Sequence, residues 1–228
     1  MKALVDVFFQ PGTLFASLGE RRGAWILPLL LNMILMVGTT ALVIHYIGME
    51  TIVRQRLEQT RLSPEQMQVA LSRAASPSQV YISYIGAGVG GAITMAVIAG
   101  VLFAFGLMTS KEPKYASMLA MVSLAFFPYF LVTGIMTALI LLATPDRASL
   151  DVGNLIATNV GAYMNKEGMA KGLYSLLTSL DVLSFLEIGL LALGFSKLTR
   201  AGYFAGLGAV MGLWILYVSS KMAISLLF

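Results

Sequence analysis

Residues Ser179 to Arg200 read SLDVLSFLEIGLLALGFSKLTR, and this stretch decides the fold. It is an apolar run long enough to cross a bilayer, yet it carries two carboxylates, Asp181 and Glu187. A helix turns about 100° per residue, so Ser184 and Gly194 fall with the two carboxylates within one arc of about 140°. Because an ionised carboxylate costs several kcal/mol in hydrocarbon, we expect this arc to face protein and not lipid. The rest of the chain must then supply the interior of a helical bundle.

The composition is that of an integral membrane protein. The chain has 228 residues, of which 58% are hydrophobic and 11% are charged, whereas soluble domains carry about 25% charged residues. Its mean hydropathy is +0.83. The absence of cysteine excludes a disulfide framework, a thiolate nucleophile and a Cys-ligated zinc, and the single histidine, His45, leaves no histidine-rich metal site. We therefore expect no metal and no cofactor.

Five apolar runs predict five membrane-spanning helices in one domain, residues 1–228. Each run is as long as the roughly 20 residues that a span requires. The fold class is an all-α polytopic bundle with spans at about 24–47, 82–108, 116–143, 173–195 and 203–228. The first 23 residues are amphipathic, and we expect them to form an uncleaved interfacial helix on the membrane surface.

The basic residues lie at the ends of the apolar runs, a pattern that sets membrane topology and does not indicate nucleic-acid binding. The N-terminal side has short segments dense in positive charge: Lys2, Arg21, Arg22, Lys111, Lys114, Lys197 and Arg200. The other side spreads its charges over longer loops: Arg54, Arg56, Arg61, Arg73, Arg147, Lys166, Lys171 and Lys221. The positive-inside rule places the N-terminus in the cytoplasm and the C-terminus outside.

Two long outside segments, 48–81 and 144–172, are expected to contain short helices. In the first, Ser63, Pro64 and Gln66 form a helix start, so a helix should run from Pro64 to about Ala74. In the second, apolar residues between Leu155 and Met164 share one helical face. These helices cover their own bundle or meet a periplasmic partner.

Small residues and prolines mark expected packing sites and bends in the spans. Small residues four apart let helices approach closely, and the expected packing glycines are Gly86, Gly90, Gly91, Gly202, Gly206, Gly208 and Gly212. Pro28 and Pro128 are expected to kink spans one and three.

The intramembrane polar residues are assigned partners by their depth along the helices. Asp181 and Lys221 lie near the outer ends of spans four and five, which predicts an ion pair between them. Glu187 lies near the bilayer middle, where Asn32 and Ser123 are the polar groups at similar depth. We expect Glu187 to be protonated and hydrogen-bonded to one of these two. A structural bond and a functional carboxyl both remain open.

Several separated stretches resemble the Yip family of polytopic membrane proteins, which are named for their interaction with Ypt/Rab GTPases. The stretches are Phe8-Phe9-Gln10-Pro11, Thr13-Leu14-Phe15, Trp25-Ile26-Leu27-Pro28-Leu29, Lys114-Tyr115-Ala116, Phe126-Phe127-Pro128-Tyr129, Leu180-Asp181-Val182-Leu183-Ser184 and Leu190-Leu191-Ala192-Leu193-Gly194. The resemblance implies five spans, a cytoplasmic N-terminus and a non-enzymatic role in membrane organisation or trafficking. The short N-terminal region resembles the bacterial branch, whose members look like accessory proteins, some of them associated with ABC-type exporters.

Three function classes compete for this sequence. A non-catalytic accessory or organising subunit of a membrane transport or trafficking complex needs packing faces, long outside loops and a protein partner in the membrane or periplasm. The alternative is a small transporter or proton-linked carrier that uses Glu187 and Asp181 as relay groups. An intramembrane enzyme would need a nucleophile with a base, or a metal site, and the sequence predicts neither. We expect the accessory role, with no enzymatic activity and with a homo-oligomer left open.

Overall fold

The computed structural model describes residues 2–57, 63–74, 76–109, 113–165 and 168–227. Five of its helical segments are long and apolar enough to cross a membrane, which confirms the predicted all-helical, membrane-spanning class. These spans are α3 (Ile26–Ile47), the continuous helix of α6 (Pro77–Ile85), η2 (Gly86–Gly90) and α7 (Gly91–Gly106), then α8 (Tyr115–Ala143), α10 (Val182–Thr199) and α11 (Tyr203–Leu227).

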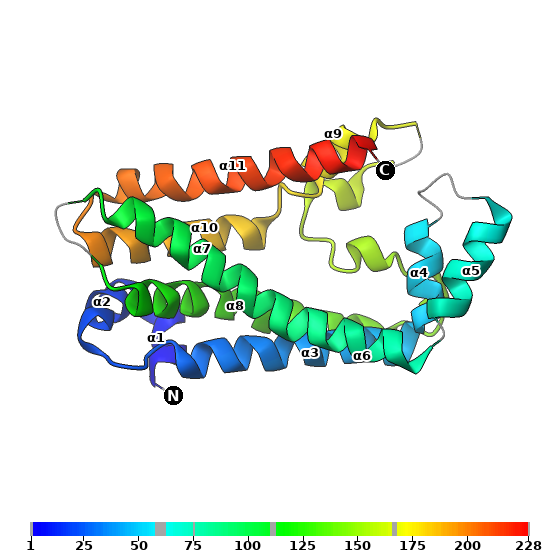
Figure 1. Ribbon diagram of the computed structural model, residues 1–228, viewed down its shortest axis with the longest axis horizontal. Coiled ribbons are helices and arrows are strands. Elements are labelled where there is room, and N and C mark those ends of the chain that lie inside the picture. The colour runs from blue at the N-terminus through cyan, green and yellow to red at the C-terminus, as the bar shows by residue number, and fades with distance from the viewer. Residues whose placement is uncertain (1, 58–62, 75, 110–112, 166–167, 228) are drawn as a thin grey trace.

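The two ends of the bundle are built differently (Figure 1). One end, called the short-turn end, carries the α7–α8 and α10–α11 turns together with α1 (Lys2–Phe9) and α2 (Pro11–Ser17). The other, called the long-loop end, carries α4 (Met49–Leu57), α5 (Pro64–Ala74), α9 (Lys171–Leu177) and the C-terminus. Span two crosses the bundle diagonally, because α6 and η2 contact α3 whereas α7 reaches α8, α10 and α11.

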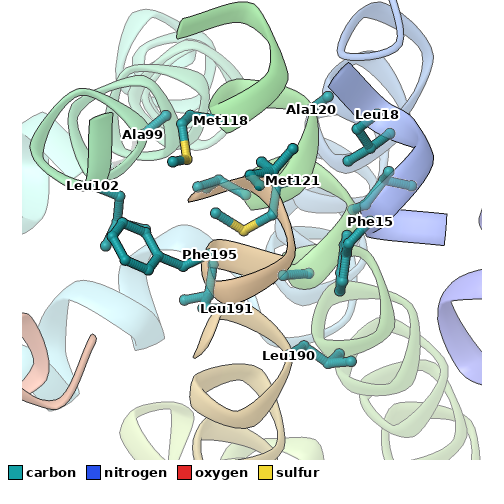
Figure 2. Close-up of a cluster of buried hydrophobic side chains, with 14 of the residues drawn as sticks. Phe15, Leu18, Ala99, Leu102, Met118, Ala120, Met121, Leu190, Leu191 and Phe195 are labelled. Carbon is teal, nitrogen blue, oxygen red and sulfur yellow. The ribbon is translucent and has the colours of Figure 1, made fainter. Parts of the chain in front are cut away.

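The hydrophobic core occupies the short-turn half of the bundle. The central helix, α8, packs against α3, α7, α10 and α1. Its buried residues run almost without a break from Ser117 to Pro128, whereas the buried residues of α10 begin at Ile188 and continue to its end. Because α10 runs antiparallel to α8, these two buried stretches meet. Figure 2 shows Met121 of α8 within this cluster, between Phe15 on one side and Phe195 on the other.

The N-terminal segment enters the bundle instead of only lying on the membrane. Phe15 is 0% exposed, and Val7, Leu14 and Leu18 are also buried in the main core. The opposite face of α1 is open, with Phe9 79% exposed. The expectation of a purely interfacial helix is therefore wrong for α2 and for one face of α1. Their apolar side chains pack against α8 and α10. This packing removes more apolar surface from contact with water and polar headgroups than binding at the membrane surface would.

The second span begins earlier than predicted and contains a π-helical turn. It runs from Pro77 to Gly106, not from residue 82 to residue 108. Pro77 occupies the first turn of α6, where a missing backbone N–H has no cost. The π turn coincides with the glycine-rich stretch Gly86–Gly90, since glycine tolerates the wider backbone turn without steric penalty from a side chain.

The fourth predicted span is interrupted, so the prediction of one helix over residues 173–195 is wrong. α9 ends at Leu177, and α10 begins at Val182. Between them Asp181 adopts extended backbone angles, and its carboxylate accepts from the backbone N–H groups of Leu183 and Ser184 at 2.7 and 3.2 Å. Aspartate is among the best helix N-caps, so the residue expected inside a span begins one.

Of the two loops at the long-loop end, the first is helical and the second is mostly not. α5 covers Pro64–Ala74, and Ser63 and Gln66 exchange hydrogen bonds in a capping box at its start. The second loop holds the short 3₁₀ turns η3 (Arg147–Ser149), η4 (Val152–Asn154) and η5 (Val160–Tyr163), and only η5 lies within residues 155–164, where a helix was expected. The side chains of Asp151 and Asn159 cap the last two turns, which breaks the helical periodicity.

Candidate functional site

Asp181 is fully engaged within its own surroundings. One carboxylate oxygen caps α10, and the other accepts a 2.6 Å hydrogen bond from the hydroxyl of Thr158. The backbone around Thr158 also pairs with the backbone at Asp181, through Val182 N–H to Thr158 O at 3.2 Å and Val160 N–H to Leu180 O at 3.1 Å. Asp181 therefore connects the loop around Thr158 to the start of α10.

The predicted ion pair between Asp181 and Lys221 is wrong. The ammonium of Lys221 donates to Thr178 Oγ1 at 3.0 Å, Ser179 Oγ at 3.1 Å and the Ser175 carbonyl at 3.5 Å. These oxygens lie at the C-terminal end of α9, where the helix dipole favours a cation. In the described part of the chain no carboxylate lies within 4 Å of this ammonium. Lys221 thus fastens α11 to α9, and depth alone predicted the wrong partner.

Asn32 and Ser123 meet each other and not Glu187. The Asn32 side-chain amide donates to the Ser123 backbone carbonyl at 2.7 Å and contacts Met95 Sδ at 3.4 Å. Both residues are completely buried between α3 and α8. Asn32 Oδ1 and Ser123 Oγ have no hydrogen-bond partner among the residues the structure describes. This pair locks spans one and three together, so the prediction that either residue pairs with Glu187 is wrong.

Glu187, like Asn32 Oδ1 and Ser123 Oγ, has no hydrogen-bond partner among the described residues of its own chain. It lies one residue before the buried stretch of α10 and is itself partly buried. Its carboxyl is close enough to Tyr129 of α8 and to Asp181 to interact with them electrostatically. None of the residues that the structure describes forms a hydrogen bond with it. Glu187 therefore lies where the buried stretch of α10 stops, on the side of the long-loop end.

The shared arc predicted for α10 is partly reproduced. At Gly194 an added Cβ would overlap the side chain of Met121 and lie 3.3 Å from Phe15, so this part of the arc faces protein. Glu187 and Ser184, about two and three turns closer to the start of α10, are only partly buried. The arc thus passes from tight packing at one end of α10 to incomplete cover at the other.

Only some of the predicted packing glycines contact a neighbouring helix. A Cβ at Gly91 would overlap Met36, and one at Gly206 would lie 2.6 Å from the Ala192 carbonyl oxygen. Among the described atoms, nothing lies within 4 Å of a Cβ placed at the other predicted positions: Gly86, Gly90, Gly202, Gly208 and Gly212. The spacing of four identifies a helix face but not its occupant, so the packing role is wrong within this chain for those five.

Gly88 and Gly106 are close approaches that the pattern did not identify. A Cβ at Gly88 would lie 2.9 Å from Val37 Cγ2, and one at Gly106 would lie 2.6 Å from Pro113 Cγ. The π turn rotates Gly88 towards α3, and no spacing rule for a regular helix anticipates that rotation.

The two prolines differ in role. Pro28 is the third residue of α3, in the first turn, where a missing N–H is tolerated, so the expected kink of span one is wrong. Pro128 lies inside α8, which continues for 15 more residues to Ala143, so it removes one backbone bond from the middle of the central helix. The next residue is Tyr129, so the missing backbone hydrogen bond lies close to the region of Glu187.

Tyr129 and Thr158 are the polar residues near this site that the sequence interpretation missed. Tyr129 is in the middle of a 29-residue span, whereas tyrosines of membrane proteins gather at the interfaces, and that position is a usable signal. Thr158 is distant in sequence from Asp181 and is brought to it by irregular loop structure, for which no sequence pattern gives a signal.

The groups at this site can form hydrogen bonds and exchange protons. Asp181, Glu187 and Tyr129 offer two carboxyls and a phenol, and no group of three His, Asp or Glu side chains able to hold a metal ion occurs in the described segments. Comparison with known proteins gave no match to any family model, curated protein or solved structure.

Proposed function

We propose that this protein is a non-catalytic accessory or organising subunit of a membrane transport or trafficking complex, with an ABC-type exporter as the first class of partner to test. The observation that carries the proposal is Glu187, a carboxyl inside a membrane-spanning helix without a hydrogen-bond partner in the described chain. Such a group costs several kcal/mol in hydrocarbon unless a donor meets it. A polar side chain from a partner helix supplies that donor.

The surroundings of Glu187 favour a protein partner. The first six residues of α10, Val182 to Glu187, contribute nothing to the buried core, and α8 beyond Pro128 contributes only Thr137 and Leu141 within its fully described length. Membrane helices associate through packing and interhelical hydrogen bonds, so a partner helix laid against this region would gain both. Among the described residues of this region, none donates a hydrogen bond to the Glu187 carboxyl.

The surface of α11 offers a second packing face. Gly202, Gly208 and Gly212 are exposed and open to a neighbouring backbone. Small residues allow close helix approach in a membrane, which fits either a partner subunit or a second copy of this chain. The resemblance to the Yip family, with its role in membrane organisation, points in the same direction.

The proposed setting is a bacterial inner membrane with the N-terminus in the cytoplasm. Six of the seven basic residues counted for that side, all except the undescribed Lys111, lie at the short-turn end or on the segments leading to it: Lys2, Arg21, Arg22, Lys114, Lys197 and Arg200. The positive-inside rule associates such density with the cytoplasmic face. The long-loop end then faces a periplasmic component.

The test is a mild-detergent pull-down of the tagged protein from its native membrane, comparing wild type with Glu187→Gln and Glu187→Leu. We expect the same partner subunits with wild type and Glu187→Gln, because an amide still hydrogen-bonds. Glu187→Leu should lower their recovery by about tenfold, the effect of losing one intramembrane hydrogen bond of about 1–2 kcal/mol. Glu65→Gln, on exposed α5, is the matched control.

A wild-type protein that purifies alone would contradict the accessory role. In that case Glu187-dependent proton flux in reconstituted protein would establish the carrier alternative in its place. Full recovery of partners with Glu187→Leu would keep the accessory role but contradict the part assigned to Glu187.

A further inference from the structure

A cavity opens beside the first span at the short-turn end. Its volume is about 240 Å³. Leu4 of α1, Leu18 of η1 (Leu18–Glu20), Leu27 and Pro28 of α3, and Leu124 of α8 form its apolar walls. The cavity is therefore bounded by four elements, α1, η1, α3 and α8, and by the segment that joins η1 to α3.

Two arginines lie on that joining segment and line the same cavity. Arg21 and Arg22 are both exposed. No carboxylate among the described residues lies within 4 Å of either guanidinium, although Glu20 is their neighbour in sequence. Guanidinium groups bind phosphate oxygens with two parallel hydrogen bonds, so an unpaired pair of arginines presents a site for a phosphate anion.

An apolar path leads from the arginines into the membrane. Leu27, Leu30 and Ile34 are all exposed on α3, and their spacing of three and four residues puts them on one helix face. This face begins within one and a half turns of Arg22, where the span itself begins. A ligand with a phosphate at the arginines would therefore have its hydrocarbon chain along this face.

We propose that Arg21, Arg22 and the adjoining cavity bind the headgroup of an anionic phospholipid, with one acyl chain lying along Leu27, Leu30 and Ile34. The charge complementarity selects an anionic headgroup, and the apolar walls select a lipid over free phosphate. Basic pockets beside membrane helices are a recurrent form of lipid-headgroup site. The site is separate from Glu187 and does not depend on the proposed subunit role.

The test is native mass spectrometry of delipidated protein titrated with phosphatidylglycerol or phosphatidylcholine of identical acyl chains. Wild type should bind phosphatidylglycerol at least about tenfold more tightly, and Arg21→Gln/Arg22→Gln should lose that preference. The control variant Lys114→Gln/Lys197→Gln removes the same charge from exposed lysines at the same end that do not line the cavity, and it should keep the preference.

A second variant and a competitor separate a built site from general attraction. Leu27→Trp, which narrows the cavity and keeps the charge, should also weaken phosphatidylglycerol binding, and excess inorganic phosphate should not displace the lipid. Equal binding of both lipids by wild type would overturn the proposal. So would an equal effect of the arginine and lysine variants, an unaffected Leu27→Trp, or displacement by phosphate alone.

Discussion

The two charged side chains at the long-loop end of the spans, Asp181 and Lys221, are satisfied by nearby backbone and hydroxyl groups. Asp181 caps the helix that follows it, and Lys221 binds the end of α9. The two side chains carry opposite charges and lie near the same end of the bundle, yet each has a closer set of partners. Short-range geometry at a helix terminus therefore outweighs charge pairing between helices in this region.

Removing the carboxylate of Asp181 should destabilise the long-loop end. Asp181→Ala loses the α10 cap and the bond from Thr158, and we expect a free energy of unfolding lower by about 2 kcal/mol. Asp181→Asn keeps a capping oxygen, so its free energy of unfolding should lie between those of wild type and Asp181→Ala. Unfolding in bicelles by steric trapping measures this, with limited proteolysis reporting on the loop around Thr158.

Asp146→Ala is the matched control for this experiment. Asp146 lies in the same loop as Thr158. Its backbone carbonyl accepts a hydrogen bond from the Ser149 hydroxyl, and its side chain does not cap η3. Its substitution should leave stability within about 0.5 kcal/mol of wild type. Equal effects of the two alanine variants would contradict the capping role of Asp181.

Residue-level prediction from the sequence succeeded for part of one helix face and failed for partners. Gly194 was placed on the protein side of α10 because helix periodicity is regular, whereas Glu187 on the same arc is only partly buried. Partners at equal depth could not be chosen, because depth leaves the rotation of each helix undetermined. Asn32 and Ser123 show this, since they share the predicted depth with Glu187 but face each other across α3 and α8.

Helix contacts depend on single glycines, and α11 contains a pair that tests this. Gly206→Ala places a Cβ 2.6 Å from the Ala192 carbonyl, so α10 and α11 must separate, at a cost of about 1–3 kcal/mol. Gly208→Ala meets no described atom within 4 Å and should be neutral or stabilising, because alanine favours helix. Thermal unfolding in detergent distinguishes the variants. Indistinguishable melting temperatures would show that the α10–α11 contact is looser than described.

The insertion of α2 into the core can be tested with two phenylalanines. Phe15 is completely buried against α8 and α10, and Phe15→Ala should lower the free energy of unfolding by about 3–5 kcal/mol. Phe9→Ala, on the exposed face of α1, should change it by less than about 0.5 kcal/mol. A small effect at both positions, measured by unfolding in detergent, would restore the surface-bound interpretation of the N-terminal segment.

Element boundaries were predictable where hydropathy and helix geometry coincide. Spans one, three and five agree closely with α3, α8 and α11, because each is a single uninterrupted apolar helix. Span four was misplaced because the apolar run continues through the break at Asp181, and hydropathy does not register a cap. The π turn in span two escaped prediction because its glycines fit a regular helix equally well in the sequence.

At the scale of the whole molecule, most of the buried core lies in one half of the bundle. The buried stretches of α8 and α10 meet at the short-turn end, whereas the described part of the long-loop end holds a small buried cluster of Ile47, Ile52 and Leu141. Composition and hydropathy predicted the number of spans. They contain no information on which half of the bundle is completed by this chain, since lipid-facing and partner-facing residues are equally apolar.

The central claim is that a second polypeptide completes the region of Glu187, and site-specific photo-crosslinking in native membranes tests it most directly. The probe replaces Leu186, which is 51% exposed beside Glu187, and the control probe replaces Ile34 of α3, which is 65% exposed. We expect a protein adduct at Leu186 that disappears when Glu187→Leu is added, and no such adduct at Ile34. Identical products at both positions, or an adduct at Leu186 that is indifferent to Glu187, would contradict the claim.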